Sequence, residues 1–232
     1  MHVLFEDHHL IAVNKPAPLL TQAPPGIPSL EAQVKDYIKR TCNKPAGVYL
    51  GIPHRLDRPV TGVVLFARNT KAAARVAEQF QQHTVVKLYW ALVDGTVAEE
   101  AGEWRDFILK IETEARVELV AEGTERAREA ITSFRVLKKL DGTTLLELAP
   151  RTGRMHQLRV QAAKRGHPII GDTLYGSTRC FGPPVELPRD RRVALHARSL
   201  SLAHPFGKTS LTIEAPLPEL WSEQPGMPTV QN

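Results

Sequence analysis

Residues 54–62 read His-Arg-Leu-Asp-Arg-Pro-Val-Thr-Gly and place one carboxylate, Asp57, between Arg55 and Arg58. A carboxylate beside guanidinium groups stays ionised at neutral pH. An ionised carboxylate can act as a nucleophile or a general base, and it can equally form a structural ion pair. Taken alone, the segment favours the structural pair and leaves a reactive Asp57 open.

A second polar cluster opens a helix predicted over residues 153–165, and it consists of Arg154, His156, Gln157 and Arg159. Arg159 falls on the same apolar face of that helix as Met155. A charge on an inward face is costly unless it is paired. The spacing therefore predicts a buried anion near Arg159, for which Asp57 is the natural candidate. The alternative is an exposed basic helix from which Arg159 reaches solvent.

Patterns for other kinds of site are missing or incomplete. Side chains that could bind a metal are His54, Asp57, His156, His167 and His196, but no two histidines are four residues apart and no thiolate is nearby. The phosphate-binding and serine-hydrolase motifs G-x-x-x-x-G-K-[ST], G-x-G-x-x-G and G-x-S-x-G do not occur. We therefore expect neither a metal nor a nucleotide cofactor.

The elements that must position these side chains are short strands and a few helices. Apolar runs and turn residues predict strands over residues 3–6, 10–15, 62–68, 87–93, 131–140, 144–148, 195–203 and 209–215. Helices are predicted from an N-cap at Ser29 to about Thr41, from a cap at Thr70, and over 153–165. Because strands follow one another without regular β-α-β alternation, the predicted class is α+β with a mixed, mostly antiparallel sheet.

The composition indicates a single domain. The chain has 232 residues, of which 42% are hydrophobic, enough for one domain over residues 1–221 followed by a disordered tail over 222–232. Its two cysteines suit free thiols in a reducing compartment. The N-terminus does not read as a signal peptide, and no stretch approaches the ~18 apolar residues of a membrane span. We expect a cytoplasmic protein that does not contact membranes.

Charge is unevenly distributed along the chain. Residues 151–198 hold ten Lys or Arg against three acids, a balance of +7, whereas residues 94–126 hold ten acids against four bases, a balance of −6. A strongly basic segment is typical of polyanion binding. The alternative is a solvated charged surface.

Four stretches, in order, resemble the RluA-type pseudouridine synthase family. They are LFEDHHLIAVNKPAPLL, HRLDRPVTGVVLFARN, KLYWALVDG and GRMHQLRVQAAKRGHPIIGDTLYG, and the final hairpin LHARSLSLAHP also fits. The resemblance implies a sheet with a central cleft flanked by helices and loops, with Asp57 on the cleft floor. It also implies an isomerase that converts a uridine of tRNA or rRNA to pseudouridine without a cofactor.

The resemblance further implies roles for individual residues. Asp57 is the essential aspartate, which either attacks C1′ or assists elimination across C1′ and C2′. Arg159 is its ion-pair partner, and Tyr89 lies against the target base. Arg55 takes the place of the everted nucleotide. The substrate-binding residues are His54, Arg55, Leu56, Arg154, His156 and Gln157.

The chain also departs from the family pattern. Pro59-Val60-Thr61 stands where the family often has Asp-Thr-Ser or Pro-Thr-Ser, and Met155 replaces a threonine or serine; both changes bear on substrate fit. Many relatives carry an N-terminal S4 RNA-binding domain, whereas the catalytic pattern here starts at Val3. We therefore expect a stand-alone member that holds RNA with residues 151–198 and has no obligatory protein partner.

Two other functions remain open from the sequence. One is a non-catalytic RNA-binding module on the same fold, for which the set Asp57, Tyr89 and Arg159 has no use. The other is a hydrolase in which Asp57 acts with His54 or His156 as acid and base. An isomerase returns RNA of unchanged mass, whereas a hydrolase releases a product.

Overall fold

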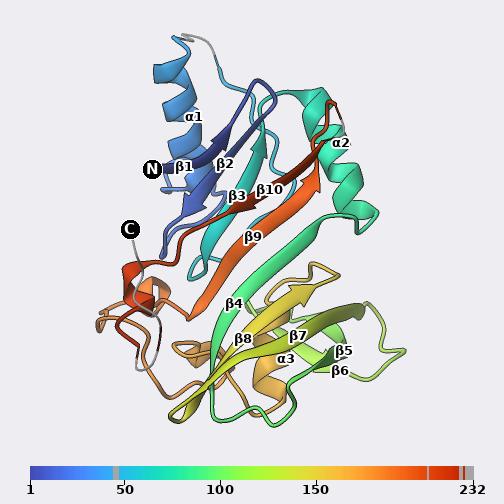
Figure 1. Ribbon diagram of the computed structural model, residues 1–232, viewed down its shortest axis with the longest axis vertical. Coiled ribbons are helices and arrows are strands. Elements are labelled where there is room, and N and C mark those ends of the chain that lie inside the picture. The colour runs from blue at the N-terminus through green and yellow to red at the C-terminus, as the bar shows by residue number, and fades with distance from the viewer. Residues whose placement is uncertain (44–46, 208, 225–226, 228–232) are drawn as a thin grey trace. The chain divides into compact units, whose positions relative to one another are not determined.

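The computed structural model describes residues 1–43, 47–207, 209–224 and 227. They form two compact units, Met1–Val86 with Ala197–Pro216, and Lys87–His196 with Leu217–Asn232 (Figure 1). Each unit contains strands and at least one helix. The expectation of a single domain over residues 1–221 stays a prediction, and most of the 222–232 tail lies outside the described residues.

The first unit contains the N-terminal strands and most of the last hairpin of the chain, which β9 and β10 form. Its strands are β1 (His2–Glu6), β2 (Leu10–Lys15), β3 (Thr61–Ala67), β9 (Leu195–Ala203) and β10 (Ser210–Glu214). The first four follow the order β1-β2-β3-β9, and β10 pairs with β9 off this path. The pairs β1/β2, β2/β3 and β9/β10 are antiparallel. These strands confirm the ones predicted from sequence.

Both helices of the first unit begin at a capping side chain. The Oγ of Ser29 accepts from Ala32 N, which confirms the predicted start of α1 (Leu30–Thr41). In α2 (Thr70–Gln81) the cap is Asn69, whose Oδ1 accepts from Ala72 N at 2.9 Å. The prediction of Thr70 as the cap was therefore wrong by one residue, because asparagine accepts this bond at least as well as threonine.

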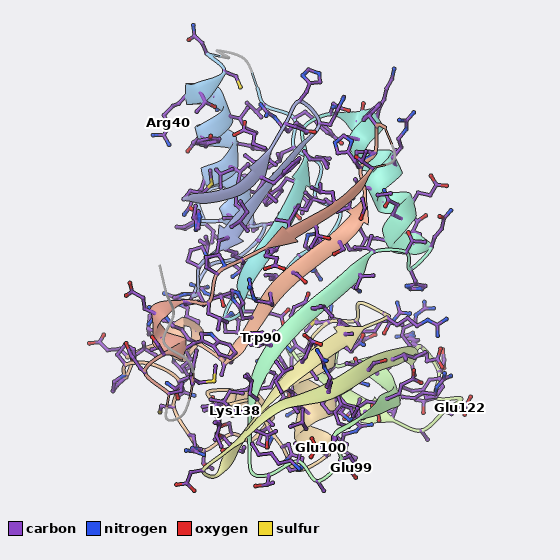
Figure 2. The ribbon with its side chains drawn as sticks, viewed as in Figure 1. Arg40, Trp90, Glu99, Glu100, Glu122 and Lys138 are labelled. Atoms are coloured by element: carbon purple, nitrogen blue, oxygen red, sulfur yellow. The ribbon has the colours of Figure 1, made fainter. Side chains whose placement is uncertain are left out.

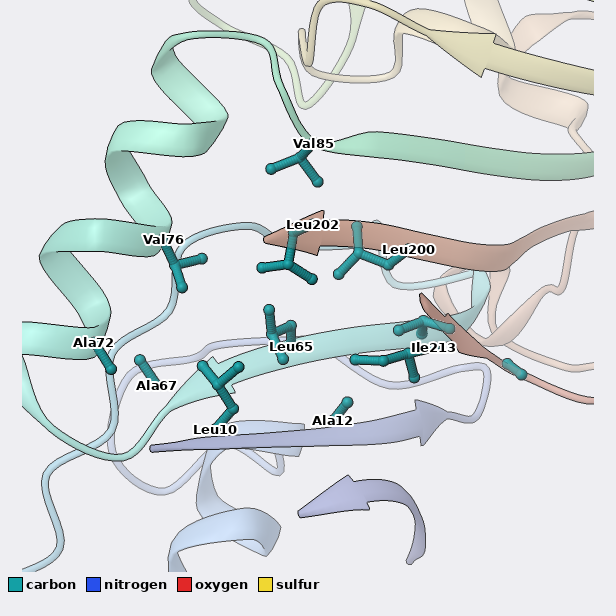
Figure 3. Close-up of a cluster of buried hydrophobic side chains, with 12 residues drawn as sticks. Leu10, Ala12, Leu65, Ala67, Ala72, Val76, Val85, Leu200, Leu202 and Ile213 are labelled. Atoms are coloured by element: carbon teal, nitrogen blue, oxygen red, sulfur yellow. The ribbon is translucent and has the colours of Figure 1, made fainter. Parts of the chain in front are cut away.

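The core of the first unit lies between its strands and α2 (Figure 3). Its buried side chains are Leu10, Ala12, Val63, Leu65, Ala67, Ala72, Val76, Val85, Leu200, Leu202, Ile213 and Ala215. Residues two apart on a strand point to the same face, which is why alternate positions of β2 and β3 enter this cluster. The core therefore fixes β3, whose first residue follows the Asp57 segment by a few positions.

The second unit is an antiparallel sheet. Its strands are β4 (Val86–Asp94), β8 (Thr143–Pro150), β7 (Arg128–Leu140), β5 (Ala101–Lys110) and β6 (Val117–Val120), in the spatial order β4-β8-β7-β5-β6. All four neighbouring pairs are antiparallel. The predicted hairpin around Asp141-Gly142 is confirmed. Together the two units confirm the α+β class with a mostly antiparallel sheet; the central cleft stays a prediction.

Strands β5 and β6 were not predicted from sequence, because they lie in the acidic segment 94–126. Glu99, Glu100 and Glu122 are exposed at the periphery of the second unit (Figure 2). Other carboxylates of the segment pair with neighbouring arginines, as Glu112 does with Arg126 at 2.6 Å. Charge masks the strand signal here, since it occupies the exposed face, while buried side chains such as Trp104 carry the packing.

The third helix is shorter than predicted. Helix α3 spans Gln157–Lys164, not 153–165. His156 adopts a left-handed conformation with φ 50°, which ends any helical run from residue 153. Arg154 and His156 therefore lie in a loop over residues 151–156 that precedes α3. Among the described residues, no helix has the length and hydropathy that a membrane crossing requires.

Gly62, at the start of β3, offers a test of how tightly this strand is packed. It has φ 116°, and a Cβ at this position would overlap the backbone of Ala197. We expect Gly62→Ala to lower the free energy of unfolding by about 3 kcal/mol or more, from strain and overlap together. Gly123, at φ 83° with no atom within 4 Å of its Cβ position, is the matched control. Gly123→Ala should cost about 1 kcal/mol in urea unfolding, and equal losses would contradict the overlap.

Candidate active site

The segment that carries Asp57 is held against β2 by a buried lysine. Lys15 is completely buried, and its ammonium group donates to three backbone carbonyls, Pro16 O at 3.1 Å, Arg58 O at 3.2 Å and Val60 O at 2.7 Å. Two of these carbonyls flank Asp57 on its C-terminal side. The lysine therefore fixes the turn in which Val60 N donates to Asp57 O at 3.1 Å.

The charge of Lys15 is coupled to that of Asp57. Burial lowers the pKa of Lys15 to about 7; the Asp57 carboxylate raises that pKa and Arg58 lowers it further. No hydrogen bond joins Lys15 to Asp57, so the two act on one another through their charges alone. Lys15 was not predicted as a site residue. The available signal was a lysine at the end of a mostly apolar strand, directly before a proline.

The hydroxyl group of Thr21 fixes the N-terminal side of the segment that carries Asp57. The Oγ1 of Thr21 donates to Leu56 O at 2.9 Å and accepts from Leu56 N at 3.1 Å. The side chain of Leu56 is buried, with 6% exposed. Both backbone groups of the residue before Asp57 are thereby satisfied without solvent, and Asp57 is fixed from both sides.

His54 faces inward from this segment. Its Nε2 accepts from Leu65 N at 2.9 Å, and its ring stacks on Phe80 with centroids 5.1 Å apart. A ring nitrogen that accepts a backbone N–H carries no proton, so the ring is neutral with its proton on Nδ1. This bond uses the Nε2 lone pair and gives His54 a role in anchoring the segment to β3.

Arg55 is more accessible than the residues around it. Arg55 is exposed and makes no hydrogen bond or ion pair with the described residues, while Asp57 is half-buried, as His54 and Arg58 are. A rigid backbone thus presents one exposed cation two residues before a half-buried carboxylate.

In the second unit, Tyr89 lies on β4, where it pairs with Leu148 of β8. Lys87 is two residues earlier and therefore on the same face of the strand. The ammonium group of Lys87 donates to Thr152 O at 3.1 Å, and burial lowers the pKa of Lys87 to about 8. The side chains of β4 and the loop 151–156 are therefore joined beside Tyr89.

Arg159 is buried, as predicted, and so the alternative of a snorkelling side chain was wrong. Only 5% of the residue is exposed. Its Nε donates to Asp172 Oδ2 at 2.6 Å and its Nη2 to Asp172 Oδ1 at 2.8 Å. The predicted buried anion exists and is Asp172, which the sequence analysis did not name. An additional pair between Arg159 and Asp57 stays a prediction.

Gln157 is buried, and the structure gives its amide a positioning role. Its Oε1 accepts from Thr152 Oγ1 at 2.8 Å and from Arg154 N at 3.0 Å. Its Nε2 donates to Ile131 O at 3.1 Å and to Thr132 Oγ1 at 2.9 Å. These four bonds fill the capacity of a primary amide. Gln157 therefore holds the loop 151–156 to β7, and its contact with substrate stays a prediction.

Arg154 and His156 project from that loop. Arg154 is exposed, and its Nε donates to Glu129 O at 3.0 Å. The Nδ1 of half-buried His156 lies 2.9 Å from Tyr175 Oη, which accepts from Val117 N at 3.0 Å. Tyr175, which the sequence analysis did not single out, thus fixes His156 from the side of β6.

The structure groups the predicted site residues by unit. Asp57, His54, Arg55 and Leu56 share one segment of the first unit, and Tyr89, Arg154, His156, Gln157 and Arg159 share the second. Within the described residues there is no group of three His, Cys, Asp or Glu that could hold a metal ion. A reaction without metal or cofactor stays a prediction. The first unit offers an oriented carboxylate and a buried ammonium group, and the second offers a phenol and a buried guanidinium. Carboxylates and phenols are groups that can carry out acid–base or nucleophilic chemistry.

Comparison with known proteins gives a consistent result. A family model described as RNA pseudouridylate synthase matches residues 9–164. A tRNA pseudouridine synthase C from Vibrio parahaemolyticus is 32% identical and covers 96% of this chain and 93% of its own length; one from Salmonella typhi is 36% identical and covers 96% and 88%. The solved structure of human RNA pseudouridylate synthase domain containing 4 matches with a TM-score of 0.78 at 27% identity, over 95% of this chain and 90% of that one.

The buried ammonium group of Lys15 makes the pH dependence of stability a test of this site. Burial lowers the pKa of Lys15 to about 7 in the folded protein, from about 10.5 in the unfolded chain, so the unfolded chain binds more protons between these values. Stability should therefore rise with pH from about 7 to about 10, by up to about 1 kcal/mol per pH unit from this group. Urea unfolding at pH 7, 8 and 9 should show a flatter rise for Lys15→Met.

The exposed Lys71, on α2 of the same unit, is the control for that experiment. Lys71→Met should leave the slope of stability against pH as it is in the wild type. A Lys15→Met protein with the wild-type slope would show that Lys15 titrates normally in the folded state.

Proposed function

The chain belongs to the RNA pseudouridylate synthase family, and we propose that it isomerises a uridine of tRNA to pseudouridine with Asp57 as its reactive group. Membership confirms the resemblance noted from the sequence motifs and makes the chain a pseudouridine synthase. The observation that carries the proposed role of Asp57 is its setting. Lys15 and Thr21 hold the backbone on both sides of a half-buried carboxylate.

The reaction requires one bond to break and another to form. The N1–C1′ bond of the uridine breaks, the base turns, and C5 joins C1′. The hydrogen of C5 is lost and N1 gains one, so the product is an isomer of the same mass. Asp57 either attacks C1′ and forms a covalent intermediate, or assists elimination across C1′ and C2′; both routes need an ionised carboxylate at a fixed position.

The proposed partners of Asp57 in this reaction are Tyr89 and Arg55. Tyr89 lies against the target base and assists removal of the proton from C5. Arg55 fills the space that the everted nucleotide leaves, which suits a planar cation because unstacking a base costs a few kcal/mol. The exposure of Arg55 and its lack of bonds to the described residues support that role.

We further propose that Arg159 is the ion-pair partner of Asp57. A guanidinium carries five N–H donors, and the pair with Asp172 uses Nε and Nη2. The Nη1 donors take no part in that pair, and we assign one of them to the Asp57 carboxylate. Asp172 would then orient the guanidinium, and Asp57 would pair with the same positive charge. Such a pair is a reason to bury an arginine beside a reactive acid.

The choice of tRNA over ribosomal RNA rests on the relatives. Those from Vibrio parahaemolyticus, Salmonella typhi and Vibrio cholerae are named tRNA pseudouridine synthase C. The basic residues of segment 151–198 are the proposed contacts for phosphate groups. A structured RNA with a uridine in a loop suits base eversion, because an unpaired base leaves its stack at less cost.

Asp57→Ala should lower pseudouridine formation by on the order of 100- to 10,000-fold and leave RNA binding largely intact. The measurement is carbodiimide-blocked primer extension on total RNA from the host, from a strain lacking the gene, and from that strain carrying each variant. We expect a tRNA stop that disappears on deletion and returns with the wild-type gene only. Asp36→Ala, which removes an exposed carboxylate of α1, should restore the stop fully.

Other outcomes of that mapping point elsewhere. A stop that disappears from ribosomal RNA would keep the isomerase and change its substrate. Binding that survives in both proteins with no site changed would favour the non-catalytic RNA-binding module. Full activity of Asp57→Ala would remove Asp57 from the mechanism.

The role of Arg159 can be separated from its role in stability. Arg159→Met alone should cost about 3–5 kcal/mol, because Asp172 is left buried with its charge unpaired. The double variant Arg159→Met/Asp172→Leu should recover most of that loss in urea unfolding. If Arg159 acts on Asp57, the folded double variant should still be inactive in primer extension while it binds RNA. A folded and active double variant would show that the arginine serves only to pair Asp172.

A further inference from the structure

Lys87 is a cation without a counter-charge. Its ammonium group makes one hydrogen bond, to Thr152 O, and no ion pair with any described residue. The other buried cation of this unit, Arg159, has a bidentate carboxylate. A partly desolvated cation is normally paired with an acid, because otherwise no Coulomb attraction offsets the free-energy cost of its burial. The exception at Lys87 therefore points to an anion that comes from outside the chain.

The surroundings of the ammonium group are open to such an anion. A Cβ at Gly153 would lie 4.0 Å from Lys87 Nζ, so glycine leaves no side chain between this part of the loop and the ammonium. Arg151 and Arg154, on either side of that segment, are both exposed. Glu129, whose carbonyl accepts from Arg154, has its carboxylate on Arg105 at 2.8 Å. Two exposed arginines thus lie in the loop that meets Lys87, and the Glu129 carboxylate is engaged by Arg105.

The loop that meets Lys87 is rigid. Thr152 Oγ1 donates to Gln157 and accepts from Ile131 N, and Arg154 N donates to the same Gln157 amide. Lys87 donates to the carbonyl of the residue so fixed. A preorganised cation loses little conformational freedom when a ligand binds, so its contact contributes more to affinity than that of a mobile surface lysine.

We propose that Lys87, together with residues 151–154, binds a backbone phosphate of the RNA next to the uridine that Tyr89 faces. Residues two apart on a strand are separated by roughly 7 Å, which is the scale of one nucleotide, so the phosphate is that of the target or an adjoining nucleotide. The inference rests on the proposed function for the identity of the RNA. It adds a phosphate site that fixes the register of the strand relative to Tyr89.

Burial disfavours the charged form of Lys87, whereas the proposed phosphate contact needs that charge. Burial lowers the pKa of Lys87 to about 8, which means that the folded protein holds this charge at a cost in the absence of RNA. The single hydrogen bond of Lys87, to Thr152 O, offsets little of that cost, whereas an anionic ligand would offset more of it. Its removal should therefore weaken binding without weakening the fold.

The test compares Lys87→Met, Lys87→Arg and the control Lys110→Met, which removes an exposed lysine of β5. The probe is unmodified tRNA from the strain lacking the gene, and binding is followed by filter retention between 50 and 300 mM salt (roughly the range over which phosphate contacts weaken). For Lys87→Met we expect about 10-fold weaker binding and a slope of log K against log salt that is smaller by about 0.7–0.9. Its melting temperature should stay the same or rise.

The remaining variants and readouts complete the test. Lys87→Arg should keep the wild-type slope, and Lys110→Met should keep slope and affinity alike. In the steady-state kinetics of pseudouridine formation, Lys87→Met should raise KM about 10-fold and leave kcat within a few fold of the wild-type value, because a phosphate contact acts on binding. Wild-type slope and affinity in Lys87→Met would overturn the proposal. So would weaker binding with an unchanged slope and a lower melting temperature, which would mark a structural role.

Failure of the proposed function is distinguishable from failure of this inference. If the wild type binds the tRNA with a slope that depends on Lys87 but forms no pseudouridine in it, the phosphate site stands and the tRNA substrate falls. If the wild type forms pseudouridine and Lys87→Met binds identically, the function stands and the phosphate site falls. A wild type that does not bind tRNA overturns both.

Discussion

The contact of the Lys15 ammonium with three backbone carbonyls is the interaction on which the Asp57 segment depends. A carboxylate would hold a buried lysine more strongly, yet carbonyl acceptors leave the charge of Asp57 available for chemistry. The Asp57 carboxylate raises the pKa of the lysine through space. One buried side chain thereby sets both the position of the loop and the electrostatic setting of the acid.

The loop 151–156 is organised by a different principle. An amide, Gln157, uses both of its donors and both of its acceptor sites on two neighbouring elements, and the loop then follows a path that no helix would allow. His156 takes the left-handed conformation at its end. Neutral hydrogen bonds are well suited to this task, because they fix a backbone without adding charge next to the lysines and arginines that a polyanionic substrate needs.

The sequence predicted the elements well where apolar periodicity is undisturbed and less well where polar residues take over. The strands of the first unit and the start of α1 were predictable, since alternation and a serine cap each have a direct physical meaning. Strands β5 and β6 were not, because exposed acids dilute the alternation. The start of α3 was missed because a left-handed His156 is set by the loop's hydrogen bonds, which no local pattern records.

The same distinction applies to the candidate site. Motifs identified Asp57, Tyr89 and Arg159, but motifs name side chains and not their partners. That Arg159 needs a buried anion followed from its place on an inward face; that Asp172 supplies it required the fold, although Asp172 is one of only three acids in the basic segment. Lys15 and Lys87 read as ordinary strand residues in sequence, and only their burial marks them as part of the site.

Among the described residues, the buried Lys15 and Arg159 and the half-buried Lys87 have three different kinds of hydrogen-bond partner. Arg159 forms an ion pair with Asp172, which fixes the orientation of the guanidinium. The attraction between the two charges offsets the free-energy cost of burying them. Lys15 has three carbonyls, which neutralise little of its charge and leave it to act on Asp57. Lys87 has a single carbonyl and no acid. Among the described residues, neither lysine is bonded to a carboxylate, whereas Arg159 is. The roles proposed for the two lysines, one beside Asp57 and one toward RNA, both need a charge that the fold does not already pair.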